Sequence, residues 1–370
     1  MACLRKISCL LGLLVIVASV CDARVRAPSE FDRPFLFNGF NSYWMMNVAA
    51  ELSDRIKVSD VFCEASAADQ ALQVSPGVYD KRVVQALDFV ISEAARNGIR
   101  LILRRPQYTQ WARNAGVPIN NGDDFYTNAV VKGYYKNHVQ RMLTRMNSIT
   151  RVAYRNDPTI MAWELMNEPR CQVDYSGNTV NEWAQEMASF VKSIDNKHLL
   201  GIGMEGFYGD SMPSRKQYYP GYQVGTDYIK NNMITEIDFA TIHAYPDIWT
   251  RMLKQFLCRG GWKSHLADAE TIIRKPLVFT EFGKSKKDPD YNPSVRDSYM
   301  NALYSDIYNL ARNGGAFGGG MVWQILAEGM DSYDDGDEIV LSKDQSTRAI
   351  ISQQSNKMAS LEHNLIVHHG

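Results

Sequence analysis

The stretch I-M-A-W-E-L-M-N-E-P-R-C, from Ile160 to Cys171, predicts one strand of a buried parallel sheet. Its apolar part is short, and Asp157-Pro158 and Pro169 bound it. A short apolar run between such breakers is typical of a buried strand rather than a helix. Asn167 and Glu168 are therefore expected at the carboxyl end of this strand, the end at which an α/β barrel carries its active site.

A second stretch, P-L-V-F-T-E-F-G from Pro276 to Gly283, has the same pattern, with Glu281 at its exit. Each glutamate alone could cap a following helix or pair with an arginine. Two strand-end glutamates in one chain favour a shared pocket, because carboxyl ends of parallel strands meet at one edge of a sheet. Paired carboxylates facing one pocket are what glycoside hydrolysis requires.

The rest of the chain alternates short apolar runs with longer amphipathic ones, the pattern of a βαβα fold. The predicted strands lie at Phe35–Trp44, Arg100–Leu103, Ile160–Glu168, Leu199–Glu205, Phe239–Tyr245, Leu277–Glu281 and Gly319–Gln324. The predicted helices lie at Asp80–Asn97, Tyr126–Arg151, Asn181–Ser193, Lys263–Ile273 and Pro293–Arg312. Seven strands are one short of a (β/α)8 barrel, and no strand of normal length fits between Asp69 and Tyr79.

Four motifs carry a resemblance to a known family. W-E-L-M-N-E-P-R, H-A-Y-P, T-E-F-G and V-W-Q, in this order and each at a strand end, resemble glycoside hydrolase family 5. The chain is similar to the plant endo-β-1,4-mannanases of that family from Phe35 to about Leu361. The resemblance implies an α/β fold of the (β/α)8 TIM-barrel type and retaining hydrolysis of mannan-type polysaccharide. It implies no cofactor and no metal ion.

The resemblance assigns the two glutamates different roles. Glu168 is the expected general acid/base, which must be protonated to give its proton to the leaving oxygen. Glu281 is the expected nucleophile, which must be ionised to attack the anomeric carbon. A retaining enzyme holds its two carboxyl groups about 5–5.5 Å apart, against about 6.5–9.5 Å in an inverting one. We therefore expect the shorter separation.

Four further residues are expected to bind substrate. The resemblance gives Asn167 a bond to the sugar 2-hydroxyl, whereas an asparagine here could also cap the next helix. It places Tyr245 beside the nucleophile with His243 nearby, and alternation along a strand sends both side chains to one face. Trp323 lies at the end of the last strand, and because the C–H faces of sugars stack on aromatic rings it is expected to form a floor under the cleaved sugar. His243 and Trp323 could instead belong to the core. Arg170 could contact substrate or pair with an acid.

The missing second strand leaves the activity in question. In the resembled family that strand ends in an arginine and, shortly after, a tryptophan, and both face the cleft. Neither is present here, and Arg104–Gln107 and Thr250–Gly261 also depart from the family's loops. The sequence therefore predicts weak or absent hydrolysis of mannan. The alternatives are a related β-1,4-glucanase and a barrel that binds wall polysaccharide without cleaving it.

The amino terminus has the pattern of a secretory signal peptide. Arg5 and Lys6 precede an apolar run from Leu10 to Val20, and small residues follow at Cys21 and Ala23. That run is too short to span a bilayer, which takes roughly 20 residues. We expect residues 1–23 to be the signal peptide, with cleavage after Ala23. A single barrel domain over residues 24–370 would then be secreted to the cell wall.

Charge and cysteine content exclude other classes. The formal net charge is −1, and no basic patch indicates nucleic acid or an anionic membrane as a partner. Beyond the leader, Cys63, Cys171 and Cys258 match no zinc motif, and three thiols cannot all pair within one chain. The acidic run Asp331–Glu338 resembles a calcium loop only loosely, so a solvated loop is the favoured interpretation. The oligomeric state is left open.

Overall fold

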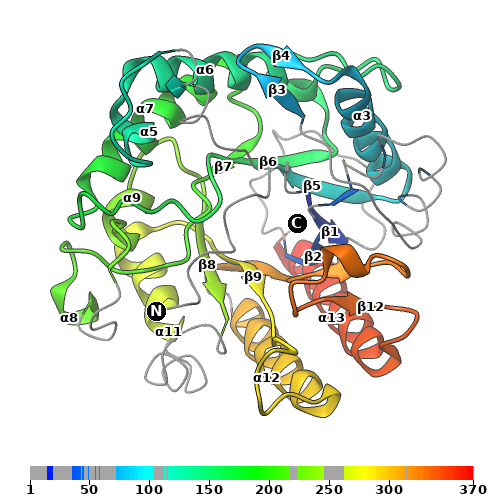
Figure 1. The fold of residues 1–370 in the computed structure, drawn as a ribbon. Coiled ribbons are helices and arrows are strands. Elements are labelled where there is room, and N and C mark those ends of the chain that lie inside the picture. Colours follow the sequence, from blue (N-terminus) through cyan, green and yellow to red (C-terminus); the bar gives the residue numbers. More distant parts are fainter. Residues whose placement is uncertain are drawn as a thin grey trace.

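The computed structural model describes residues 15–19, 36–42, 44, 45, 49, 55, 58, 72–103, 112–113, 116–216, 223–245, 262–313 and 316–369. Its centre is an eight-stranded sheet with the order β7-β6-β5-β1-β2-β10-β9-β8, and the helices lie around it (Figure 1). All neighbouring strands pair in parallel except β1, which is antiparallel to both of its neighbours. The fold is of the (β/α)8 barrel type, in which all strands normally run in parallel, and β1 is the strand that does not.

The predicted sheet strands are all present, with shifted ends. They are β2 (Phe37–Asn41), β5 (Ile99–Leu103), β6 (Ile160–Glu164), β7 (Leu199–Gly201), β8 (Ala240–Ala244), β9 (Leu277–Phe282) and β10 (Phe317–Val322). The eighth is β1 (Val15–Ser19), and β11 (Ile325–Leu326) pairs with β12 (Ile339–Val340) outside the main sheet. The strands β6, β8 and β9 are buried along their whole length, as expected for apolar runs inside a barrel.

The predicted helices also form. The longer ones are α3 (Lys81–Arg96), α6 (Ala129–Leu143), α7 (Asn178–Ile194), α12 (Pro293–Arg312) and α13 (Gln345–His369). The shorter ones are α5 (Asp124–Thr127), α8 (Pro213–Lys216), α9 (Tyr228–Asn232) and α11 (Trp262–Asp268). Helix α11 continues into a π-helical turn, η4 (Ala269–Ile273). Two 3₁₀ turns are η3 (Tyr154–Asn156) and η5 (Asp331–Tyr333). Asp80 caps α3 by accepting from the Arg82 amide.

Among the residues that the structure describes between β2 and β5, no segment forms the predicted second parallel strand of the main sheet. Residues Gln73–Ser75 (β3) and Val78–Tyr79 (β4) form a small antiparallel hairpin outside the main sheet. The strand β3 therefore does not replace the missing strand of the main sheet. The strand β1, whose five residues belong to the predicted leader, lies instead between β2 and β5 (Figure 1).

In the described part of the chain, no strand ladder closes the barrel between β7 and β8, and isolated hydrogen bonds link these two ends of the sheet instead. The amide of Asp238 donates to the Leu200 carbonyl at 2.8 Å, and the amide of His243 donates to the Glu205 carbonyl at 3.1 Å. Between them, the Thr241 hydroxyl accepts from the Met204 amide at 2.7 Å. These bonds hold the segment that follows β7 against β8, and one of them involves His243 of the predicted site.

Several predicted elements are too long, among them β2, for which Phe35–Trp44 was predicted and Phe37–Asn41 is found. The β6 strand ends at Glu164 and β7 at Gly201, each four residues early, because the chain leaves the regular ladder there. The predicted helix Tyr126–Arg151 begins later and ends at Leu143. The residues after it turn away because the Arg145 guanidinium pairs with the buried Asp88 carboxylate at 2.5 Å.

Several predictions fall on residues that the structure does not describe, namely Arg104–Gln107, Thr250–Gly261, Cys63 and Cys258. Cys171 is described and is a buried free cysteine, which confirms that at least one thiol is unpaired. Burial raises the pKa of this thiol, so it is held in its unreactive protonated form. A search of the helices in the described part of the chain finds none with the length and apolar character that a membrane crossing requires.

Candidate active site

Glu168 lies in the loop after β6, where backbone bonds fix its position. Beyond the end of β6, the amides of Leu165 and Met166 still donate to Gly201 and Ile202, and the Glu168 amide donates to the Gly203 carbonyl at 2.8 Å. Glu168 has a positive φ of 47°, which is uncommon for a residue with a side chain and is often found at functional sites. Its side chain is 28% exposed, so it can reach a bound substrate.

Gly203 is required for this arrangement. Its φ is +90°, and a Cβ atom built there would lie 1.9 Å from the Met166 carbonyl oxygen. A backbone atom cannot move far enough to relieve this clash in place. Any side chain at this position would therefore push the loop of Glu168 away from the segment after β7.

Glu281 lies within β9 and is buried. The hydroxyl of Tyr245, just beyond the end of β8, donates to Glu281 Oε2 at 2.7 Å. Burial and the Glu281 carboxylate raise the pKa of Tyr245 well above its usual value, so the hydroxyl keeps its proton and acts as a donor. The hydroxyl therefore holds one carboxylate oxygen of Glu281 in a fixed position.

His243 lies between the two glutamates. Its Nδ1 atom is 2.8 Å from Glu168 Oε1 and 3.5 Å from Glu281 Oε2. One carboxylate oxygen of each glutamate and one ring nitrogen of His243 all lie within 4.8 Å of one another. The two carboxyl groups are therefore as close as in a retaining glycosidase, about 5–5.5 Å, and far below the inverting range.

The other two predicted substrate ligands lie at strand ends. Asn167 directly precedes Glu168 and is exposed. Trp323 follows β10 and is half-buried, and its indole Nε1 donates to Asp335 Oδ2 at 2.7 Å. Its backbone amide donates to the Phe282 carbonyl next to Glu281, at 2.7 Å. The bond to Asp335 fixes the ring plane, as a platform for a sugar would require.

The sequence analysis missed a third glutamate, Glu205. It lies after β7, is buried, and accepts two bonds from the Arg170 guanidinium, from Nε at 3.0 Å and from Nη2 at 2.5 Å. The same Nη2 atom lies 3.4 Å from Glu168 Oε2. Arg170 thus joins Glu205 to Glu168. The signal was available, because Glu205 ended a predicted strand just as Glu168 and Glu281 did.

Burial, followed by the nearby charge of Glu168, raises the pKa of Glu205 to about 7. A carboxyl whose pKa is higher in the folded than in the unfolded chain stabilises the fold fully at low pH. This contribution is lost as the pH rises from about 4.5 towards 7.

We expect Glu205→Gln to remove this pH dependence, because an amide does not titrate. The difference in unfolding free energy between variant and wild type should change by up to about 1.4 kcal/mol per pH unit across that window. Chemical denaturation at pH 4.5, 5.5 and 7 measures it. Glu182→Gln, at an exposed position on α7, is the control. A constant difference between Glu205→Gln and wild type would contradict the assignment.

We expect Tyr245→Phe to lower kcat by about 10- to 150-fold, the factor for losing one hydrogen bond to a charged group. The reason is that Glu281 Oε2 loses the donor that positions it, while the ring still fills its place. Steady-state kinetics on a soluble mannan, with Tyr175→Phe at an exposed position as control, tests this. An unchanged kcat would show that the bond has no catalytic role.

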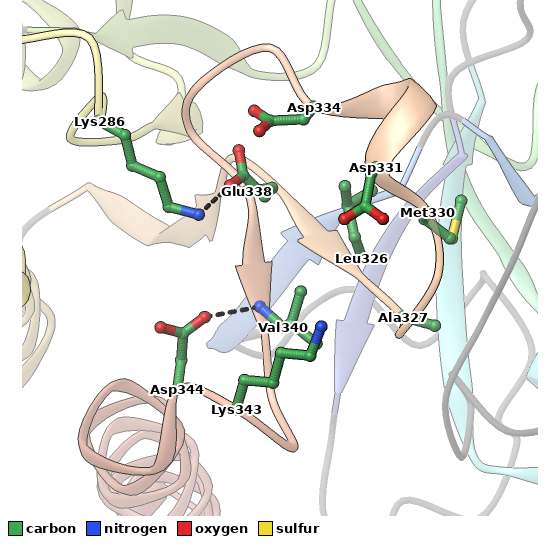
Figure 2. Close-up of a pocket in the computed structure, with 10 residues that line it drawn as sticks. All are labelled: Lys286, Leu326, Ala327, Met330, Asp331, Asp334, Glu338, Val340, Lys343 and Asp344. Atoms are coloured by element: carbon green, nitrogen blue, oxygen red, sulfur yellow. Dashed lines mark hydrogen bonds and ion pairs between the residues drawn. The ribbon is translucent and has the colours of Figure 1, made fainter.

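The acidic run Asp331–Glu338 was expected to be a solvated loop, but part of it is buried and paired. Asp337 and Glu338 are buried, and the Lys286 ammonium pairs with Glu338 (Figure 2). Oxygen atoms of Asp334, Asp335 and Glu338 lie close enough to share a cation, but the lysine already neutralises Glu338. A cavity of about 170 Å³ lies beside this loop, and its lining includes none of the predicted site residues.

The chain matches a known protein family. Residues 56–332 match the family described as GH family 5 beta-mannosidase-like, which is more than half of the chain. The chain belongs to this family. The (β/α)8 barrel and the class of glycoside hydrolase follow from the membership.

Plant enzymes are among the relatives of this GH5 chain. It is 54% identical to mannan endo-1,4-beta-mannosidase 5 of Solanum lycopersicum, over 97% of this chain and 98% of the relative. It is 49% identical to mannan endo-1,4-beta-mannosidase 1 of Oryza sativa subsp. japonica, over 89% of this chain and 83% of the relative. The tomato alignment runs over 405 residues, more than the 370 of this chain, so the relative has residues that this chain lacks.

Solved structures agree with the fold. The endo-beta-1,4-mannanase from Thermotoga petrophila superposes with a TM-score of 0.67 at 25% identity, over 89% of this chain and 78% of that one. The endo-1,4-beta-mannanase from Rhizomucor miehei superposes with a TM-score of 0.70 over 89% of this chain and 95% of that one; at 23% identity it supports the fold alone.

Proposed function

We propose that the chain is a retaining endo-β-1,4-mannanase, which hydrolyses internal β-1,4-mannosidic bonds of mannan, glucomannan and galactomannan. The observation that carries the proposal is the pairing of Glu168 and Glu281, within 4.8 Å of each other through one oxygen each, with His243 between them. The similarity to plant mannan endo-1,4-beta-mannosidases supports mannose as the sugar.

In the first step, a carboxylate oxygen of Glu281 attacks the anomeric carbon. The bond from that carbon to the bridging oxygen breaks, and Glu168 gives its proton to that oxygen. In the second step, Glu168 takes a proton from water, the water oxygen attacks the same carbon from the opposite side, and Glu281 leaves. The two inversions together give retention, and both glutamates return to their starting states.

The neighbouring side chains prepare both steps. The Tyr245 hydroxyl orients the Glu281 carboxylate through Oε2. His243 Nδ1 and the Arg170 guanidinium hold the two oxygens of Glu168 from different sides. In this proposal Asn167 bonds the sugar 2-hydroxyl, and Trp323 stacks its ring on the apolar face of the cleaved sugar.

The specificity can be tested with four polymers, namely glucomannan, galactomannan, pure mannan and cellulose. Purified chain should shorten glucomannan and galactomannan internally, measured by loss of viscosity, and should release products that begin with mannose at their new reducing ends. A β-1,4-glucanase would cut cellulose and leave pure mannan intact. A binding barrel would be retained on a column of such polymers without shortening any of them, and either outcome would overturn the proposal.

We further propose that the chain is secreted and acts in the cell wall, which the charged and apolar pattern of residues 1–23 supports. Amino-terminal sequencing of the secreted protein should begin at Arg24. Recovery of an intact Met1 from the extracellular fraction would argue against this cleavage.

A further inference from the structure

The place between β2 and β5 is filled from an unexpected part of the chain. The strand β1, Val15–Ser19, pairs antiparallel with residues 38–41 of β2 and with residues 99–103 of β5. Val17, for example, lies opposite Phe40 on one side and Leu101 on the other. In Figure 1 this strand lies between the two parallel strands and joins them into one sheet.

Without β1 the sheet would be divided. Of the residues described between β2 and β5, only β3 and β4 are strands, and they form their own separate hairpin. Both β2 and β5 would then present edges with unpaired amides and carbonyls. Leu101, Ile102 and Leu103 are at most 1% exposed, so these groups lie in the core, where each unpaired one costs about 1–3 kcal/mol.

The sequence of β1 suits this position. Val15-Ile16-Val17 are β-branched, and residues 15–19 contain no charge, no proline and no glycine. Such a segment favours the extended backbone and tolerates pairing on both sides. An antiparallel strand also needs no helical crossover from its neighbour. Addition of an extended segment to exposed strand edges is an established mode of recognition.

We propose that the space between β2 and β5 is a strand-acceptor site, which residues 15–19 of the chain itself occupy. The apolar run thus has a second role beside that of a leader. Cleavage after Ala23 removes the donor strand and reopens the site, so processing lowers the stability of the barrel. The acceptor site concerns the sheet alone, and only the effect of processing rests on the proposed secretion.

Hydrogen–deuterium exchange of the full-length chain tests the proposal, with Val17→Pro and Val17→Ile as a matched pair. Proline removes a backbone donor and breaks the pairing, while isoleucine preserves it. In wild type and Val17→Ile, the amides of residues 15–19 should exchange slowly. In Val17→Pro, the amides of residues 37–41 and 99–103 should exchange at least about tenfold faster, the factor for one lost hydrogen bond.

A peptide added in trans completes the experiment. A peptide of residues 13–20 flanked by lysines should restore slow exchange in β2 and β5 of the full-length Val17→Pro chain, and the same peptide with proline at its Val17 position should not. Fast exchange of residues 15–19 in wild type would overturn the proposal. So would unchanged exchange in β2 and β5 of Val17→Pro.

Discussion

Glu281→Ala is expected to abolish hydrolysis of mannan, with a fall in kcat of at least about 10³-fold. The variant has no carboxylate to attack the anomeric carbon, so no glycosyl-enzyme can form. Glu281 is buried in β9 and its partner Tyr245 is buried as well, so no other described acid occupies the same position. Reducing-sugar release from mannan at saturating concentration measures the loss, with Glu182→Ala as the control.

Glu168→Ala should lose activity by a different route. The variant can still form the glycosyl-enzyme from a substrate whose leaving group needs no proton, such as an activated aryl mannoside, but its second step lacks a base. A small anion that attacks without deprotonation should therefore partly restore turnover in this variant.

Azide distinguishes the two roles. It should accelerate Glu168→Ala on the activated substrate and yield a mannosyl azide with retained configuration, while Glu281→Ala should give no such product. An equal azide response in both variants would contradict the roles, and rescue of Glu281→Ala alone would exchange them. Circular dichroism of both variants confirms that each is folded before the comparison is made.

The strand ends could be predicted because they follow from local chemistry. The segments at Glu168 and Glu281 are short, mostly apolar runs bounded by prolines or glycine, and burial inside a barrel favours such content. The ends of β6 and β7 were misplaced because the amides after them continue to donate across the sheet without the regular spacing of a ladder. Sequence alone cannot distinguish a ladder from such a continuation.

The partners of the site residues were harder to predict. The link from Arg170 to both Glu205 and Glu168 depends on how the loop after β6 lies against the segment after β7, and that closeness rests on Gly203. The strand β1 could not be foreseen, because its apolar run also fits the pattern of a leader. The gap that it fills was visible in the sequence as a missing strand.

The remaining prediction concerns that gap. The chain without residues 1–23 is expected to hydrolyse mannan poorly, although Glu168 and Glu281 are intact. It would lack β1 as well as the family's second strand, together with the arginine and tryptophan that the resemblance places at that strand's end. Such an arginine would orient the nucleophile, and a misplacement of 1 Å costs on the order of 100-fold in rate.

Grafting the family's second-strand segment between Ala68 and Asp69 should therefore raise kcat/KM on mannan by about 100-fold. It should also raise the temperature of unfolding, because β2 and β5 regain a parallel neighbour whose backbone satisfies their buried groups. An insertion of equal length made of glycine and serine separates the effect of the strand from that of loop length. The graft carrying Glu281→Ala should be inactive, which shows that any gain passes through the same site. Equal and robust activity with and without the graft would mean that the barrel functions without its second strand.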